Sequence, residues 1–111
     1  MKNLMCVLLF LLVTTTSFAA RQTGVVQGYV PYSDGDREIL IFKITNNVSE
    51  GCNATGRFAI DNTSLRYKST LSAIIAAFHS KEEISVEYLS SCNAWVNSAD
   101  VNFICVGDIN C

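Results

Sequence analysis

One amphipathic helix with β-type segments on both sides is the strongest structural signal in this sequence. Five apolar residues recur at the spacing of a single stripe on an α-helix: Tyr67, Leu71, Ile74, Ile75 and Phe78. Polar residues 61–64 precede the stripe and offer several N-cap side chains. Since only one helix is indicated, strands must supply most of the core.

Three β-type segments precede the helix and two follow it. Residues 25–30 and 38–44 flank an Asp-Gly pair, Asp34-Gly35-Asp36, which is typical of a hairpin turn. Residues 57–60 form a short third segment. The last two segments alternate apolar and polar residues, with the apolar set Ile84, Val86, Tyr88, Val101, Phe103 and Cys105. The order β-β-β-α-β-β predicts a mainly β fold with one helix (α+β), namely an OB-like five-stranded barrel.

Residues 1–19 have the pattern of a cleaved secretory signal peptide. Lys2 is followed by an apolar run, and Ser17-Phe18-Ala19 places small residues at a cleavage site. The apolar run is about ten residues, whereas a permanent anchor needs about 20. We therefore expect one domain, residues 20–111, that is secreted or periplasmic after the signal peptide is removed.

Four cysteines remain after the signal peptide: Cys52, Cys92, Cys105 and Cys111. An even number in a short secreted chain predicts two disulfides, and four cysteines allow three pairings. The sequence does not choose among the pairings. The spacing from Cys105 to Cys111 is short enough to close a tight C-terminal loop, which would leave Cys52 for Cys92.

Charge and composition exclude several functions. Ten acidic residues stand against eight basic ones, and Lys2 leaves with the signal peptide. Nucleic acid and anionic membrane surfaces call for a basic protein, so neither is an expected partner, and no membrane insertion is predicted. His79 is the only histidine, so neither a catalytic triad nor a metal site is expected. We predict a protein that is not an enzyme and needs no cofactor.

Two clusters of acidic residues are better explained by local structure than by a metal site or a catalytic site. Asp34, Asp36 and Glu38 lack the full ligand set of a calcium loop, so a charged hairpin turn is the better interpretation. Glu82 and Glu83 are neighbours at a strand start and point to opposite faces, which argues against acid/base catalysis. His79 is expected at the solvated end of the helix.

Four short motifs occur in order along residues 20–111. They are Thr23-Gly24-Val25-Val26, a cysteine before the helix (Cys52), a helix end at 76–80 that leads to a strand closing in Tyr88, and the segment from Cys105 to Cys111. Together they resemble the B subunits of subtilase cytotoxin and pertussis-like AB5 toxins. The chain differs in having no cysteine in the second strand and only Trp95 where the family is tryptophan-rich.

The resemblance implies a secreted bacterial protein that forms a homo-pentamer, binds sialylated glycans on a host cell surface and partners a catalytic toxin A subunit. It implies that the Thr23 hydroxyl binds the sugar carboxylate, that Tyr88 contacts the sugar, and that both face one shallow pocket. Small residues off the apolar stripe leave a helix face free to line a pore: Ser69, Ser72, Ala73 and Ala76.

Other interpretations stay open for each of these residues. For Thr23 we favour an ordinary strand residue, and a tyrosine at a strand end such as Tyr88 is more often a half-buried packing residue. Trp95 is either a sugar platform or, as we favour, a cover over a disulfide. The sequons at Asn47, Asn53 and Asn62 would stay unmodified in a bacterium. The alternative function is a small secreted or periplasmic protein-interaction module or hydrolase inhibitor without glycan binding.

Overall fold

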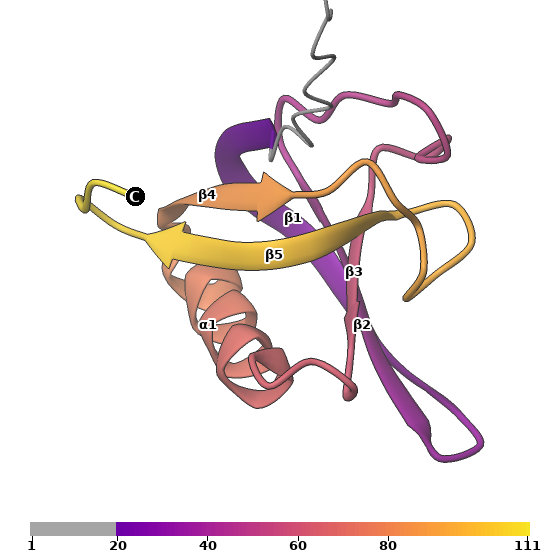
Figure 1. Cartoon of the computed structure of the whole chain (residues 1–111). Helices are drawn as coiled ribbons and strands as arrows, with labels where there is room; N and C mark the ends of the chain where they lie inside the picture. The colour runs from indigo at the N-terminus through magenta and orange to yellow at the C-terminus, as the bar shows by residue number, and fades with distance from the viewer. Residues whose placement is uncertain (1–19) are drawn as a thin grey trace, which may run out of the picture.

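Five strands pair edge to edge in a ring, and one helix packs against it (Figure 1). The computed structural model describes residues 20–111, so the predicted signal peptide, residues 1–19, lies outside the described residues. The elements are β1 (Ala20–Asp34), β2 (Arg37–Ile44), β3 (Phe58–Asp61), α1 (Tyr67–Ser80), β4 (Glu83–Tyr88) and β5 (Ala99–Val106). The predicted order of strands and helix is confirmed.

The ring closes because the long strand β1 has two partners. Residues 20–25 pair with β4, and residues 26–34 pair with β2. The strand order around the ring is β1-β2-β3-β5-β4, with only the β3–β5 contact parallel. Gly24 lies where β1 passes from one partner to the other, and a Cβ there would lie 2.4 Å from the Thr45 carbonyl oxygen. The close passage therefore requires glycine at this position.

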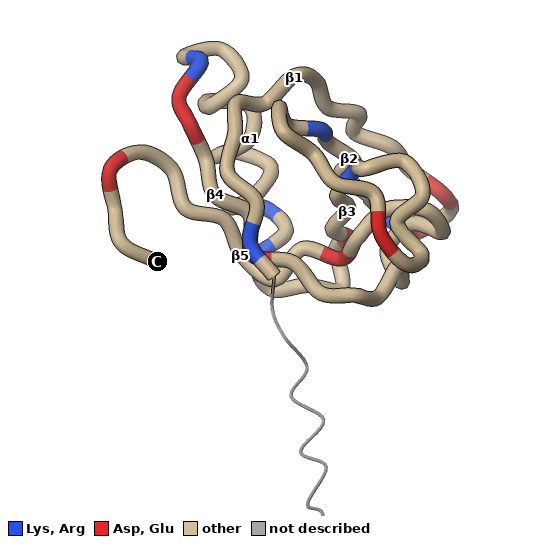
Figure 2. The backbone as a smooth tube through the Cα atoms, turned by 90° about the horizontal axis from the view of Figure 1, so that it is seen from above, with Lys and Arg blue, Asp and Glu red and all other residues tan. Residues whose placement is uncertain are grey.

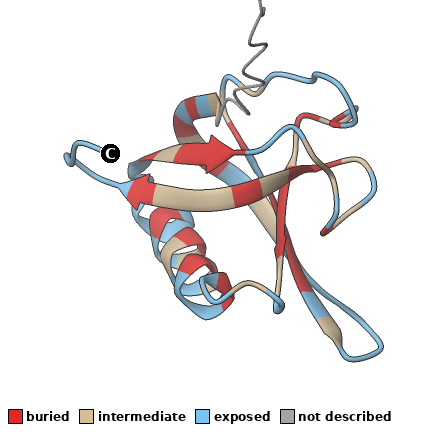
Figure 3. Cartoon of the chain, in the orientation of Figure 1, coloured by how far each residue is buried: buried red, intermediate tan, exposed pale blue. Residues whose placement is uncertain are grey.

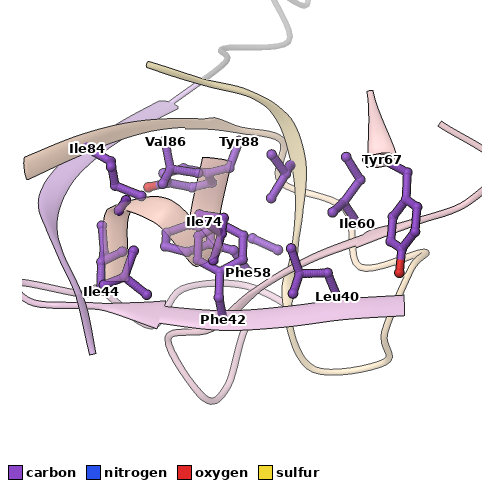
Figure 4. Close-up of a cluster of buried hydrophobic side chains, with 14 residues drawn as sticks. Leu40, Phe42, Ile44, Phe58, Ile60, Tyr67, Ile74, Ile84, Val86 and Tyr88 are labelled. Carbon is purple, nitrogen blue, oxygen red and sulfur yellow. The ribbon is translucent and has the colours of Figure 1, made fainter. Parts of the chain in front are cut away.

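The core fills the inside of the ring (Figures 3 and 4). The tilted rings of Phe42 and Phe58 have centroids 5.5 Å apart, and the Tyr88 ring also packs against Phe58, with centroids 5.2 Å apart. Further side chains of this cluster come from every strand and from the helix: Val26, Leu40, Ile44, Ile60, Tyr67, Ile74, Ala77, Ile84, Val86, Ala99 and Val101.

Helix α1 is where predicted, but its buried face is rotated. The buried residues are Tyr67, Thr70, Ile74 and Ala77, whereas Phe78 of the predicted stripe is 36% exposed and touches Tyr29 edge-on. Small residues at 70 and 77 let the helix approach the sheet closely, and the larger side chains flank that contact. The expected side-chain cap is absent from α1, because the N-cap is Arg66, whose amide hydrogen-bonds the Ser64 hydroxyl.

Strand β5 departs from the predicted alternation because of a β-bulge. Tyr88 pairs with Val101, but Glu87 pairs with Phe103, so Asn102 is the extra residue. A shift of one residue exchanges the two faces of a strand. Val101 therefore points to the core, and beyond the bulge it is Ile104 that packs there, which moves Phe103 and Cys105 to the outer face.

Two disulfides connect the four cysteines of the described chain. Cys52 is bonded to Cys92, with Cα atoms 6.1 Å apart, and Cys105 is bonded to Cys111. The first bridge joins the segment between β2 and β3 to the segment between β4 and β5. The second holds the C-terminal tail against the outer face of β5. The prediction of two disulfides is confirmed, and among the three open pairings this one is found.

Candidate functional site

Tyr88 is buried at the end of β4, with its hydroxyl in a small polar network. Its side chain is 5% exposed and belongs to the core cluster. The hydroxyl accepts a hydrogen bond from Gln22 Nε2 (3.0 Å) and donates one to Glu50 Oε1 (3.1 Å). Burial, and then the nearby Glu50 carboxylate, raise the pKa of Tyr88 above its ordinary value. The phenol is thus held neutral and oriented.

A pocket of about 260 Å³ opens beside Tyr88. It is lined by Glu50, Gly51, Asn53, Tyr88, Leu89, Ser90 and Ala99. One wall comes from the segment that holds Cys52, and the other from the segment that leads to Cys92, so the disulfide fixes the walls relative to each other. A mostly apolar pocket with a few convergent polar groups is the usual form of a small-ligand site.

Asn53 gives this pocket an unusual feature. The residue is 2% exposed, and neither atom of its side-chain amide has a hydrogen-bond partner among residues 20–111. Nearly all buried polar groups in proteins are paired, and an unpaired one costs about 1–3 kcal/mol. A buried amide with unused donors and acceptors lines the same pocket as the Glu50 carboxylate and the Tyr88 ring.

The structure does not place Thr23 in this pocket. Thr23 on β1 is opposite Ser85 on β4, and their hydroxyl oxygens are 3.0 Å apart on the exposed face of the sheet. In the same pair of strands Tyr88 is opposite Ala20 and faces the core. The two residues therefore point to opposite faces, and the expectation that they share one pocket is not met. Beside Thr23, Arg21 is paired with Glu87.

Trp95 covers a second apolar cluster on the outside of the ring. Its neighbours there are Ile39, Ile41, Ala59 and Ala94. The indole also meets Tyr32 of β1 edge-on, with ring centroids 5.2 Å apart. Cys92 and Trp95 both line a further pocket of about 310 Å³, together with Arg37, Asn93, Ala94 and Val96.

Asp100 holds the segment that carries Trp95. Its carboxylate accepts hydrogen bonds from the backbone amides of Asn93 (2.9 Å) and Ala94 (2.9 Å) and from the Ser91 hydroxyl (2.6 Å). The Arg37 guanidinium donates to the Ala94 carbonyl from the other side. These bonds give Trp95 a fixed position without regular secondary structure.

The remaining predicted residues lie on the surface. His79 is exposed in the last turn of α1, as expected, and Glu82 and Glu83 are exposed at the start of β4. Asp34, Asp36 and Glu38 flank the hairpin turn and are exposed. Over residues 20–111, basic and acidic positions are interspersed (Figure 2). No helix of the described residues is long and apolar enough to span a membrane.

Sequence reasoning missed five residues that build these sites: Gln22, Arg37, Glu50, Asn53 and Asp100. Only Glu50 and Asn53 had a local signal, since they lie two residues before and one residue after Cys52. Gln22 and Asp100 are polar residues inside strands, and their partners are 66 and 6 to 9 residues away. Such contacts follow from the closed ring rather than from sequence spacing.

Fold and sites together define a β-rich domain with two disulfides, one of which joins segments that line two pockets. Comparison with known proteins found no matching family model, no matching curated protein and no matching solved structure. The similarity to AB5 toxin B subunits therefore rests on the sequence motifs.

Proposed function

We propose that this chain is a secreted, non-catalytic glycan-binding protein of bacterial origin, similar to the B subunits of AB5 toxins and specific for sialylated glycans. The motifs in the sequence support the family. Two disulfides fit an oxidising compartment such as the periplasm or the cell exterior. One helix between the third and fourth of five strands in a ring supports an OB-like barrel.

The observation that carries glycan binding is the pocket at Tyr88, whereas the specificity for sialylated glycans comes from the resemblance. The pocket joins an aromatic ring, a carboxylate and an unpaired amide with apolar walls in a volume of about 260 Å³. Sugars present apolar C–H faces and hydroxyl groups that both donate and accept, so this combination suits them. Thr23 and Ser85 offer a separate pair of hydroxyls on the outer face, where Thr23 can still contact a longer glycan.

Assembly is part of the proposal. We expect a homo-pentamer in which the edge of β5 beyond its short contact with β3 pairs with a neighbouring subunit and α1 lines a pore, and which engages a catalytic A subunit. The free helix face supports this arrangement, because Ser69, Ser72 and Ala76 are exposed in the single chain and Ala73 is partly exposed.

A glycan array tests the proposal with three purified variants. Tyr88→Phe removes the hydroxyl but keeps the ring against Phe58, and Thr23→Ala removes the outer hydroxyl. Tyr67→Phe is the matched control, since Tyr67 lines a different pocket. We expect the wild type to bind sialylated glycans, Tyr88→Phe to bind at least tenfold more weakly, and Tyr67→Phe to bind normally. Absence of glycan binding by the wild type contradicts the proposal.

One observation favours the alternative function of a protein-interaction module. Val30 and Tyr32 are 51% and 44% exposed on the same face of the β1–β2 hairpin, and Val96, which follows the Tyr32 neighbour Trp95 in the chain, is 79% exposed. Exposed apolar side chains in one area are typical of protein contacts. A monomer in native mass spectrometry, with no glycan bound on the array, would favour this alternative.

A further inference from the structure

A cation gives the strongest hydrogen bonds to the carboxylate of an acidic sugar, and the Tyr88 pocket does not supply one. Glu50 is the only charged residue among those that line it. A sugar carboxylate placed there would face the Glu50 carboxylate in a partly enclosed site, where like charges repel. The Tyr88 pocket is therefore suited to uncharged groups, and the carboxylate of a sialylated glycan must bind elsewhere.

The pocket of about 310 Å³ that Cys92 lines has the opposite character. Among residues 20–111, Arg37 is the only charged residue that lines it. Asn93 and Trp95 also line this pocket. Its volume of about 310 Å³ is enough for one sugar ring. Cys92 lines this pocket, while its disulfide partner Cys52 lies between Gly51 and Asn53 of the Tyr88 pocket.

Arg37 is held in position by its neighbours but keeps free hydrogen-bond donors. One terminal nitrogen, Nη2, donates to the Ala94 carbonyl, and Nε forms an ion pair with Asp61 Oδ2 at 3.9 Å, a distance too long for a hydrogen bond. Among residues 20–111, nothing accepts a hydrogen bond from the other terminal nitrogen, Nη1. The side chain is 42% exposed. Two terminal nitrogens in one plane match the two oxygens of a carboxylate.

Trp95 supplies the second part of a sugar site. The indole is braced from behind by Ile39, Ile41 and Ala94, and at one edge by Tyr32. It remains partly exposed in the same pocket as Arg37. A rigid indole next to a guanidinium offers stacking for the apolar face of a sugar and a charge for its carboxylate.

We propose that Arg37 and Trp95 form the subsite that recognises the carboxylate-bearing sugar, with Arg37 as the residue that sets specificity for acidic over neutral glycans. This inference rests on the proposed glycan-binding function and assigns the acidic sugar to the outside of the β1–β2 hairpin. It gives Trp95 a ligand role in addition to its cover over the outer cluster.

Fluorescence gives a direct test, because Trp95 is the only tryptophan in the chain. Sialyllactose is titrated into the wild type while indole emission is recorded, and binding is measured in parallel by calorimetry. We expect a saturable change in emission. Lactose, and sialyllactose with its carboxylate converted to the methyl ester, should bind at least tenfold more weakly, since both lack the anion.

The matching variants are Arg37→Gln and Arg66→Gln. Arg66 lines a separate pocket next to α1, so its variant is the control for loss of one positive charge. We expect Arg37→Gln to lose at least tenfold in affinity for sialyllactose, and Arg66→Gln to bind as the wild type does. The ester comparison is made on the wild type and stays informative even if Arg37→Gln folds poorly.

The outcomes separate this inference from the function on which it rests. If sialyllactose binds by calorimetry without a change in indole emission, and the ester binds equally well, the Arg37 subsite is wrong and the glycan-binding function stands. If the wild type binds neither sialyllactose nor any glycan of the array, both proposals fail.

Discussion

The Tyr88 hydroxyl donates a hydrogen bond to Glu50 Oε1 across 3.1 Å, which ties the end of β4 to the segment between β2 and β3. Gln22 of β1 donates to the same hydroxyl through Nε2, and its side-chain oxygen Oε1 accepts from the Val48 backbone amide (3.2 Å). The network connects two strands and one loop at the mouth of the Tyr88 pocket. Loss of these hydrogen bonds should therefore lower the stability of the fold and weaken ligand binding in the Tyr88 pocket.

Alkaline pH should weaken the fold through Tyr88. In the folded state its pKa is raised mainly by burial and further by Glu50, whereas the phenol of the unfolded chain has a pKa of about 10. The stabilising effect is fully present below pH 10 and is lost as pH rises through the higher folded pKa. Urea unfolding at a series of pH values from 8 to 11 measures it. Tyr88→Phe should show a shallower decline than the wild type.

Tyr67 provides a comparison for this experiment. Its pKa is also raised, mainly by burial and also by Glu38, so Tyr67→Phe should flatten part of the same decline. If neither single variant nor the double variant changes the slope, the two phenols do not govern alkaline unfolding.

Much of the architecture could be predicted because it follows from patterns of residues that are close together in the sequence. The helix stripe, the Asp-Gly turn and the alternation in β4 each depend on residues close together in sequence. The bulge at Asn102, opposite Glu87 and Tyr88, could not be predicted, since it depends on how β5 is paired with β4. It reversed the expected roles of Phe103 and Ile104.

The candidate site was less predictable than the fold. Tyr88 was identified through the motif, but its relation to Thr23 depends on which face of the closed ring each side chain takes. The Arg37 subsite combines β2 with residues 92–96, which have no strand pattern in the sequence. Asp100 fixes that segment, and a lone aspartate in a strand gives no sequence signal for such a role.

The two disulfides should differ in their contribution to stability. The chain-entropy estimate gives about 4 kcal/mol for a separation of 40 residues and about 2 kcal/mol for a separation of 6. Double serine variants at Cys52 and Cys92, and at Cys105 and Cys111, are compared by urea unfolding. We expect the first to lose more stability. An equal loss would mean that native contacts, not loop closure, dominate.

Asp100→Asn should loosen the segment that carries Trp95. An amide has one acceptor oxygen where the carboxylate has two, so some of the bonds from Asn93, Ala94 and Ser91 are lost. We expect a loss of about 1–3 kcal/mol. Hydrogen exchange at the Asn93 and Ala94 amides should accelerate more than exchange in α1. Uniform acceleration over the chain would indicate general destabilisation and no specific anchor.

Gly24→Ala tests the close passage of β1 over the end of β2. A Cβ at this position would lie 2.4 Å from the Thr45 carbonyl oxygen and 2.6 Å from the Thr45 hydroxyl. The same threonine holds β1 through two bonds of 2.9 Å, from its amide to the Val25 carbonyl and from the Val25 amide to its hydroxyl. The added methyl group must push Thr45 away and strain both bonds, which should cost about 1–3 kcal/mol. Gly28→Ala is the matched control, because a Cβ there meets nothing within 4 Å and should change stability by less than about 1 kcal/mol. Equal stability of the two variants in thermal unfolding would show that β1 and β2 separate at Thr45 at little cost.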